Sequence, residues 1–234
     1  MPSAVAIGNL SLNIAFVLYL VIYLPQIKHN QKPEHLAELS LGWHFTITIS
    51  FALDLAYSLL KPLPWQYQTV SVVALGLLSI QHLQLTLLAK KQKSPKLKLF
   101  HATTILFLLG LVVFSTFFHA FKLPTWTLAI GTVSRIGFLI NMLPQIYQNM
   151  KLQSAEALST TFLNLSILLT TLDMISAWCL DWGLPNQIGS PITLMLTLTL
   201  RWQKAYYSRG RGFTVNLPYV SDVEVVSNNT TPKP

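Results

Sequence analysis

The chain has 234 residues, of which 52% are hydrophobic and only 10% charged, and its mean hydropathy is +0.48. Soluble domains carry about 25% charged residues, so this composition excludes an ordinary soluble domain and indicates a protein that sits in lipid. The formal net charge is +8, but the basic residues lie between apolar runs and do not indicate a nucleic-acid partner.

Seven apolar runs follow one another, each close to the roughly 20 residues that a helix needs to cross a bilayer. We therefore expect an all-α membrane protein with transmembrane helices over 4–24, 41–60, 69–89, 99–121, 124–143, 158–180 and 186–206. Three of the runs contain a charge well inside them, and these charges are Asp54, Arg135 and Asp173.

Most basic residues fall on one side of this predicted bundle. They are Lys28, Lys32, Lys90, Lys91, Lys93, Lys96, Lys98, Lys151, Lys204, Arg209 and Arg211, whereas the alternate loops hold Lys61 and Lys122. By the positive-inside rule the basic side is cytosolic. We expect a multi-pass protein with its N-terminus outside or luminal and its C-terminus cytosolic, in a lysosome-like membrane or a bacterial inner membrane. The basic side also suits contact with anionic membrane lipid.

The chain contains an internal repeat. Leu24-Pro25-Gln26-Ile27 recurs as Leu143-Pro144-Gln145-Ile146, an offset of 119 residues. The same gapless offset relates other identical residues: Asn30 and Asn149, Leu39-Ser40 and Leu158-Ser159, Asp54 and Asp173, Gln84 and Gln203. Paired repeats in a membrane protein are typical of a transporter with its site between the copies.

Each copy is predicted to hold three spans, and the fourth span restores the orientation of the second copy. We expect two parallel triple-helix bundles joined by a linker helix, a 3+1+3 arrangement. The expected organisation is a first repeat over 1–89, a basic cytosolic loop and linker helix over 90–123, a second repeat over 124–209 and a flexible cytosolic tail over 210–234.

These motifs resemble the PQ-loop repeat superfamily, which includes cystinosin-like amino-acid exporters, SWEET sugar facilitators and the KDEL receptor. The stretches YLPQIKHNQKPEHLAELS and MLPQIYQNMKLQSAEALS look most like the cystinosin-like branch, and the resemblance extends roughly from residue 12 to residue 209. It implies a transporter that works by alternating access, with the prolines of the Pro-Gln pairs as hinges.

Proline near the end of a membrane helix removes a backbone donor and weakens the local hydrogen-bond ladder. Two interpretations arise from this physics, a hinge or a plain helix stop at the membrane surface, and the resemblance favours the hinge. The neighbouring glutamines are expected either to satisfy the freed carbonyls or to gate the cytosolic mouth. The hinge or gate candidates are Pro25, Gln26, Pro144 and Gln145, and the gating or structural pair is Gln84 and Gln203.

Asp54 and Asp173 each lie 14 residues past a Leu-Ser pair, which places them roughly 21 Å along a helix at 1.5 Å per residue. A carboxylate at that depth must face a cavity or a partner. Proton coupling or binding of a substrate ammonium is one interpretation, and a structural role between helices is the other. In the cystinosin-like branch the coupling acid sits at another point, which corresponds here to the region of Ser166 and is not acidic.

Arg135 breaks the repeat symmetry, because its equivalent, Phe16, is apolar. A guanidinium stays charged and suits a carboxylate. It either binds a substrate carboxylate or neutralises Asp54 or Asp173 as an internal ion pair, and both alternatives stay open. Three neutral groups join these charges as candidates for substrate or proton binding, although polar side chains also simply join helices. They are Asn141, Asn164 and Ser166.

The sequence thus predicts a secondary transporter for a small solute, with an amino acid favoured, because an amino acid offers both an ammonium and a carboxylate to this set of charges. Proton coupling toward the cytosol is expected if the acids titrate during transport. The alternatives are a SWEET-like sugar facilitator that uses aromatic platforms such as Trp43, Trp126 and Trp178, and a receptor similar to the KDEL receptor that transports nothing.

No catalytic or cofactor motif accompanies these features. The six histidines show no metal-ligand spacing, and the chain has no Gly-rich phosphate loop and no nucleophile–base pair. We therefore predict no enzyme activity, no metal and no cofactor. The single cysteine, Cys179, excludes an intramolecular disulfide.

Overall fold

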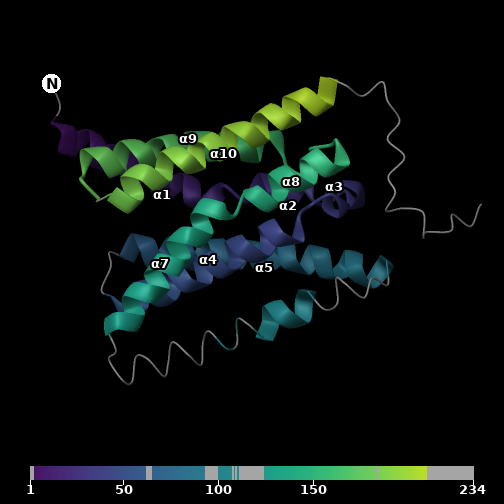
Figure 1. The fold of residues 1–234 in the computed structure, drawn as a ribbon, viewed down its shortest axis with the longest axis horizontal. Coiled ribbons are helices and arrows are strands. Elements are labelled where there is room, and N and C mark those ends of the chain that lie inside the picture. The colour runs from purple at the N-terminus through teal and green to yellow at the C-terminus, as the bar shows by residue number, and fades with distance from the viewer. Residues whose placement is uncertain are drawn as a thin grey trace, which may run out of the picture.

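The computed structural model describes residues 3–61, 65–92, 100–106, 108, 110, 124–182 and 184–209. These residues form helices joined by short connections, and none of them lies in a strand (Figure 1). The labelled helices are α1 Ala4–Val21, α2 Leu24–His29, α3 Pro33–Ala37, α4 Leu41–Leu60, α5 Trp65–Gln92, α7 Pro124–Ile140, α8 Leu143–Leu152, α9 Thr160–Cys179 and α10 Leu184–Arg209. The expected all-α class is confirmed for this part of the chain.

Serine side chains begin three of the helices. Ser3, Ser40 and Ser159 have extended backbone, and each hydroxyl oxygen accepts a hydrogen bond from the N–H three residues further on. Such a cap satisfies a donor that has no partner inside the helix. Because Ser40 and Ser159 are repeat equivalents, α4 and α9 begin at the same position in the two copies. This common start sets Asp54 and Asp173 at equivalent positions along their helices.

The first long helix of each repeat is interrupted just before its proline. Two residues separate α1 from α2, and two separate α7 from α8. Pro25 and Pro144 then occupy the first turn of the short second helix, where a missing N–H costs no intrahelical hydrogen bond. The chain therefore continues as a helix beyond each proline, which is more than a plain helix stop provides.

Among the described residues, six long helices form a closed ring of contacts. Within the first repeat α5 contacts α1 and α4, and within the second repeat α10 contacts α7 and α9. The pairs α1–α9 and α4–α7 join the two repeats. Replacing every helix by its repeat equivalent reproduces the same set of contacts. The two copies are therefore packed symmetrically around a shared centre.

Two glycines allow the repeats to approach closely. A Cβ at Gly8 of α1 would lie 2.7 Å from the side chain of Leu180, which follows α9. A Cβ at Gly131 of α7 would lie 2.8 Å from the ring of Tyr57 on α4. Small residues at such points are typical of helix packing in membranes. One contact therefore lies where α1 packs against α9, and the other lies where α4 packs against α7.

Within the described residues, four segments are long and apolar enough to cross a membrane: Ala4–His29, Trp65–Leu88, Thr127–Leu152 and Thr160–Cys179. The expected spans over 41–60 and 186–206 correspond to α4 and α10, which are not among these four segments. The expected linker helix over 99–121 and the tail over 210–234 lie largely or wholly outside the described residues. The count of seven spans thus stays a prediction.

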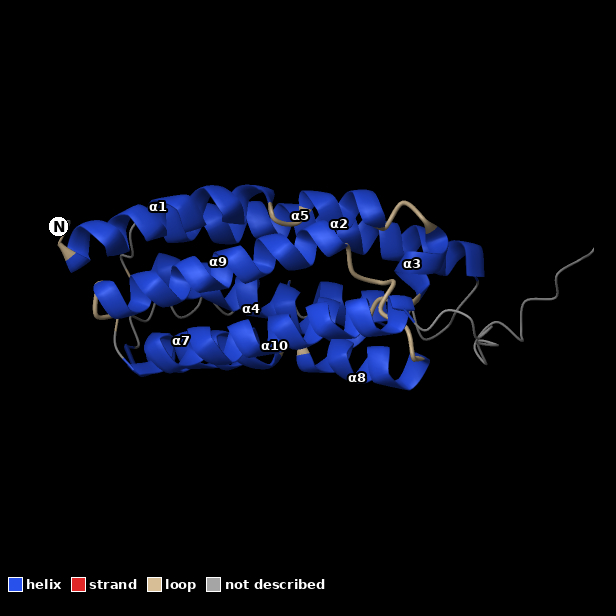
Figure 2. Ribbon diagram, turned by 90° about the horizontal axis from the view of Figure 1, so that it is seen from above, coloured by secondary structure: helices blue, strands red, loops and turns tan. Residues whose placement is uncertain are grey.

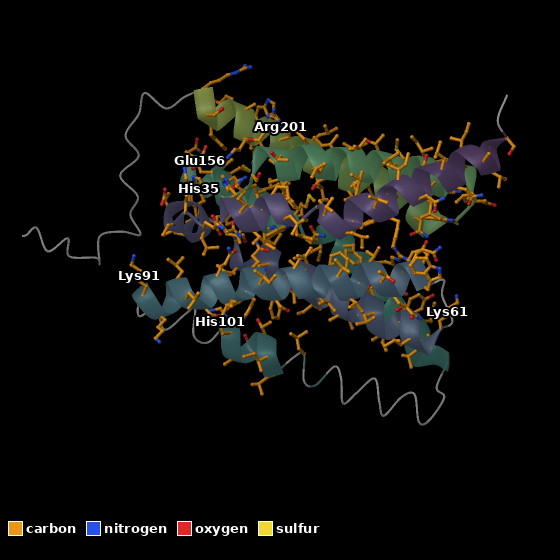
Figure 3. The ribbon with its side chains drawn as sticks, turned by 180° about the vertical axis from the view of Figure 1, so that it is seen from behind. His35, Lys61, Lys91, His101, Glu156 and Arg201 are labelled. Atoms are coloured by element: carbon orange, nitrogen blue, oxygen red, sulfur yellow. The ribbon has the colours of Figure 1, made fainter. Side chains whose placement is uncertain are left out.

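The two ends of the bundle differ. We call the end that holds α2, α3, α8 and residues 153–159 the PQ end, and the opposite one the far end (Figure 2). His35 and Glu156 lie at the PQ end, whereas Lys61 lies at the far end (Figure 3).

The largest buried apolar cluster draws side chains from both repeats, among them Tyr23, Trp43 and Phe162.

Candidate functional site

A cavity of about 810 Å³ lies at the centre of the ring. Each of the six long helices contributes to its wall, and most of the lining is apolar or aromatic. A second hollow of about 510 Å³ continues it toward the far end and shares several of its lining residues, including Tyr57, Tyr67 and Trp182. A chamber of this size and character suits a small molecule that makes a few polar contacts.

Asp54 and Asp173 both line this cavity. The carboxylate of Asp54 accepts a hydrogen bond of 2.8 Å from the hydroxyl of Ser71 on α5, within the first repeat. The carboxylate of Asp173 accepts one of 2.7 Å from the hydroxyl of Tyr19 on α1, across the two repeats. Each acid thus has one neutral donor and keeps further acceptor positions for a ligand.

Arg135 lines the same cavity and also the hollow beside it, and its side chain is exposed there. The ion pairs found among the described residues involve Glu156 with Lys204 and with His35, and none joins Arg135 to Asp54 or Asp173. The guanidinium in this structure is therefore placed where it meets the contents of the cavity.

The neutral candidates separate into two groups. Asn141 and Ser166 are buried and line the cavity. The amide nitrogen of Asn141 donates to the carbonyl of Phe138 at 2.8 Å, while its Oδ1 is buried without a hydrogen-bond partner. Asn164 is exposed and accepts a bond of 3.1 Å from Arg201. It does not line the cavity, because two residues along a helix turn a side chain by about 200° from Ser166.

Aromatic rings form the floor of the cavity toward the PQ end. The centroid of Tyr23 lies 6.2 Å from that of Phe51 and 5.9 Å from that of Phe162. Trp43 meets Phe162 edge-on at 6.0 Å. Trp178 is 61% exposed and does not line the cavity, and the side chain of Trp126 lies outside the described set. Of the three tryptophans named as platforms, Trp43 is the one placed at the cavity.

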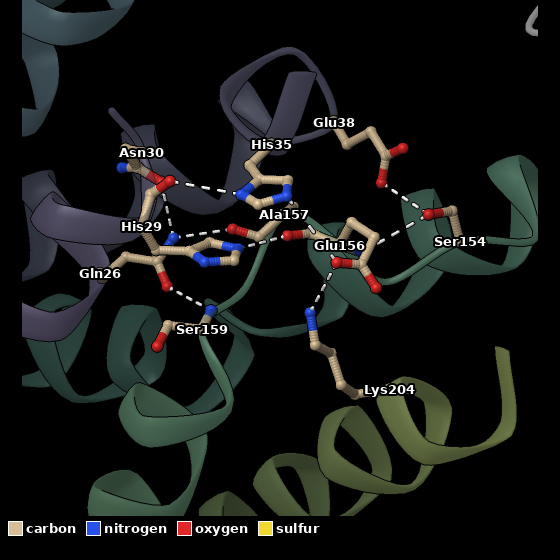
Figure 4. Close-up of polar contacts among 10 residues, drawn as sticks. All are labelled: Gln26, His29, Asn30, His35, Glu38, Ser154, Glu156, Ala157, Ser159 and Lys204. Carbon is tan, nitrogen blue, oxygen red and sulfur yellow. Dashed lines mark hydrogen bonds and ion pairs between the residues drawn. The ribbon is translucent and has the colours of Figure 1, made fainter. Parts of the chain in front are cut away.

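Below this floor, the glutamines of the Pro-Gln pairs tie the repeats together. Gln26 accepts a hydrogen bond of 2.8 Å from the backbone N–H of Ser159 and donates one of 2.7 Å to the carbonyl of Ala157 (Figure 4). Gln145 accepts the equivalent bond, also 2.8 Å, from the N–H of Ser40. Each glutamine therefore holds the N-terminus of a helix that belongs to the other repeat, and both are fully buried.

Gln84 and Gln203 support these segments from the third helix of each repeat. Gln84 donates to the carbonyl of Ile27 at 2.9 Å, and Gln203 donates to that of Ile146 at 3.2 Å. In both cases the bond stays inside one repeat. The four glutamines thus form two tiers at the PQ end: one pair joins the repeats, and the other steadies the short helices α2 and α8.

Three histidines lie in a row within hydrogen-bond distance of one another, although their positions in the sequence did not indicate a cluster. His44 Nε2 lies 3.1 Å from His82 Nδ1, and His82 Nε2 lies 2.7 Å from His101 Nδ1. These are hydrogen-bond distances, shorter than the roughly 3.3 Å between two nitrogens bound to one tetrahedral zinc. Within the described part of the chain, no group of three or more His, Cys, Asp or Glu side chains is arranged for a metal ion.

Sequence reasoning missed the partners of the two acids. The repeat offset carries a signal for one of them, because it maps Ser71 onto Ser190, which also lines the cavity. It carries none for Tyr19, whose equivalent is Phe138. The contact between Tyr19 and Asp173 arises only when α1 packs against α9. The contacts of His29, His35 and Lys204 with Glu156 were also missed.

Comparison with known proteins agrees with this geometry. The PQ loop repeat family matches residues 7–67 and 126–185, two regions that begin with the same offset of 119 residues as the Pro-Gln pairs. A solved 3.7 Å structure of a eukaryotic SWEET transporter has a TM-score of 0.57 and 16% sequence identity, covering 88% of this chain and 99% of that one. At this identity the likeness shows the fold alone. No curated protein matches the chain.

Two family matches together cover more than half of the chain, and their two copies coincide with the repeat seen in the structure. The chain is a member of the PQ-loop repeat family, with a SWEET-like fold and several membrane-spanning helices.

Proposed function

We propose that this protein is a secondary transporter for a small zwitterionic solute, with an amino acid as the favoured substrate. The observation that carries the proposal is the placement of Asp54, Asp173 and Arg135 around one cavity, with no ion pair between the arginine and either acid. An amino acid presents an ammonium for a carboxylate and a carboxylate for the guanidinium. Asn141 adds a buried acceptor without a partner, which suits an ammonium or another donor.

The mechanism proposed is alternating access by two triple-helix bundles in a 3+1+3 plan. The cavity continues toward the far end, while buried glutamines join the repeats at the PQ end. Opening at the PQ end then requires these bonds to break, with the motion absorbed at the interruptions before Pro25 and Pro144. Such a change of access around a fixed site is the general scheme of repeat-built transporters.

The orientation proposed puts the PQ end in the cytosol. Lys91 lies at the same end as His35 (Figure 3), which agrees with the positive-inside rule. Proton coupling through Asp54 or Asp173 would then drive solute toward the cytosol. The choice between a lysosome-like membrane and a bacterial inner membrane stays open.

A second candidate is a sugar facilitator. It is favoured by the aromatic floor, in which Trp43, Tyr23 and Phe162 line the cavity, because rings of this kind suit the apolar faces of a sugar. It does not require three charged side chains in the wall. We therefore rank it below the amino-acid transporter.

The experiment is a transport-coupled current. Purified protein is reconstituted on a solid-supported membrane and challenged with a panel of amino acids and neutral sugars at two pH values. We expect a current with one class of amino acid that is lost in Arg135→Gln. The matched control is Arg201→Gln, because Arg201 bonds Asn164 outside the cavity.

Other outcomes would assign the cavity differently. Tracer flux of a neutral sugar, with no current for any amino acid, would replace the proposal with the facilitator. Binding of a solute without any flux would replace it with a receptor. Equal loss of current in the two arginine variants would remove Arg135 from its proposed role as the carboxylate partner.

A further inference from the structure

A cluster of ionisable side chains lies where the two repeats meet at the PQ end (Figure 4). Glu156 stands in the segment before α9, and its carboxylate oxygen Oε2 lies 3.3 Å from Lys204 Nζ and 3.8 Å from His35 Nε2. Lys204, on α10, belongs to the same repeat as Glu156. His35, on α3, belongs to the other repeat. The contact of His35 with Glu156 is therefore an electrostatic contact across the repeat boundary.

Further contacts in this cluster cross the same boundary. His29 Nε2 donates to the backbone carbonyl of Glu156 at 2.6 Å, and Ser154 donates to the Glu38 carboxylate at 2.7 Å. The α2–α3 segment of the first repeat is thus joined to residues 153–159 of the second (Figure 4). The contacts run from His29, His35 and Glu38 to Ser154 and Glu156. If the PQ end opens during alternating access, these contacts must separate.

A hydrogen bond to the backbone of His29 determines whether Nδ1 of His35 carries a proton. Its Nδ1 lies 3.3 Å from the backbone carbonyl of His29. A carbonyl oxygen only accepts, so this contact requires a proton on Nδ1. In a neutral imidazole Nε2 then has a lone pair, and that lone pair faces the carboxylate of Glu156. A second proton, on Nε2, would instead place a positive charge 3.8 Å from that carboxylate.

The surrounding charges set how many protons the cluster can take. The rings of His35 and His29 stack with centroids 4.0 Å apart, so two positive imidazoles there would repel each other. Lys204 already neutralises part of the charge of Glu156, and the Glu38 carboxylate is held by Ser154. The charged side chains at the exposed start of α3 are those of Lys32 and Glu34. The stacking therefore disfavours two protonated imidazoles at the same time.

We propose that His35 and Glu156 form a proton-binding latch between the repeats: a proton on His35 holds the PQ end closed, and its loss favours opening. The inference rests on the alternating-access mechanism proposed above. The sign follows from linkage. A protonated His35 faces the carboxylate of Glu156 only when the repeats are together, so protonation adds an attraction that the open form lacks. Acidification therefore shifts the population toward the form whose cavity is open at the far end.

The test is a distance measurement across the PQ end. Spin labels are placed at Lys28→Cys and Tyr147→Cys, two exposed repeat equivalents, in a Cys179→Ser background. Pulsed electron resonance then gives the populations of short and long distances. When the pH is lowered from about 8 to about 5.5, we expect the ratio of short to long distances to rise at least about threefold.

Two variants and a matched control identify the groups responsible. His35→Gln and Glu156→Gln should each reduce the pH response to less than about 1.5-fold, since one removes the proton site and the other removes its counter-charge. Glu34→Gln is the control, because it removes an exposed carboxylate one residue from His35. It should respond as the parent protein does. A parent protein with no pH response, or a full response in His35→Gln, would overturn the latch.

The distance readout separates this inference from the transport proposal. If the distances respond to pH as expected but no solute gives current or flux, the latch stands and the proposed substrate is wrong. If amino-acid current is found but the distances do not respond to pH, the transporter stands and the latch is wrong. If no condition populates a long distance, the PQ end does not open, and both alternating access and the latch fail.

Discussion

At the scale of single residues, Asn141 links the cavity to stability. Its Oδ1 is buried without a partner in the wall of the cavity, and such a group costs roughly 1–3 kcal/mol in the empty protein. We expect Asn141→Leu to raise the apparent melting temperature while it weakens solute binding at least about tenfold, because the acceptor is lost. Thermal unfolding with and without solute measures both effects.

The control for this prediction is Asn164→Leu, since Asn164 is exposed and bonds Arg201 outside the cavity. Solute affinity should be unchanged in that variant. If Asn141→Leu lowers the melting temperature and keeps full affinity, the amide serves to join helices and has no contact with solute.

The hydrogen bond from Tyr19 to Asp173 makes a second prediction at this scale. It is the one cavity contact described here that joins an acid to a donor of the other repeat. Hydrogen bonds to charged groups contribute about 1.5–3 kcal/mol, so Tyr19→Phe is expected to change solute affinity by roughly 10- to 100-fold. Asp173→Asn should abolish any pH dependence of transport. Current recorded for the two single variants and the double variant measures their coupling.

Asp54, the equivalent acid of the first repeat, is the comparison for Asp173. Asp54 is bonded by Ser71 of its own repeat, so Ser71→Ala removes a donor without loosening the contact between repeats. Unchanged transport and unchanged pH dependence in both Asp54→Asn and Asp173→Asn would mean that the two carboxylates are structural.

At the scale of helices, the Pro-Gln segments hold the starts of α4 and α9. Gln26→Leu leaves the N–H of Ser159 without its acceptor, and Gln145→Leu does the same for Ser40. A buried donor left unpaired costs roughly 1–3 kcal/mol. We expect each variant to lower the apparent melting temperature by a similar amount, because the two bonds are equivalent in the symmetric packing of the repeats.

Gln31→Leu is the control for these variants, since Gln31 is exposed at the PQ end. Spin-label distances across that end provide the second readout, with the long-distance population expected to grow in both glutamine variants. A large effect from one variant and none from the other would show that the two bonds are not equivalent in solution.

At the scale of the whole molecule, much of the architecture could be read from one offset in the sequence. The repeat placed Asp54 and Asp173 at matching depths, and the structure sets them around the same cavity as Arg135. The same offset relates Ser71, the partner of Asp54, to Ser190 in the cavity wall, although the sequence analysis singled out neither serine. The match between the two copies carries this information, because both copies fold in the same way.

Other features needed the tertiary structure. Tyr19 reaches Asp173 because α1 packs on the second repeat, a choice that no local pattern encodes. Asn164 is a sequence candidate because it is polar within a predicted span, yet it lies on the other face of α9 from Ser166 and outside the cavity. The contact between His35 and Glu156 joins residues more than a hundred positions apart. Contacts between repeats are set by how the copies pack, and that cannot be derived from either copy alone.

The central claim is that the cavity gives access to solute from both ends in turn, and thiol labelling of the cavity wall tests it most directly. Ser190→Cys, in a Cys179→Ser background, places a thiol on the half-buried cavity wall. Ser208→Cys, exposed near the PQ end of α10, reports the orientation of the protein in vesicles. A membrane-impermeant thiol reagent is applied to either side, with and without a transported amino acid.

We expect the cysteine at position 190 to react readily from the far side and slowly from the PQ side, and a transported solute to raise the rate from the PQ side. Labelling from the far side alone, unchanged by any solute that binds, would contradict alternating access and leave a cavity with a single entrance.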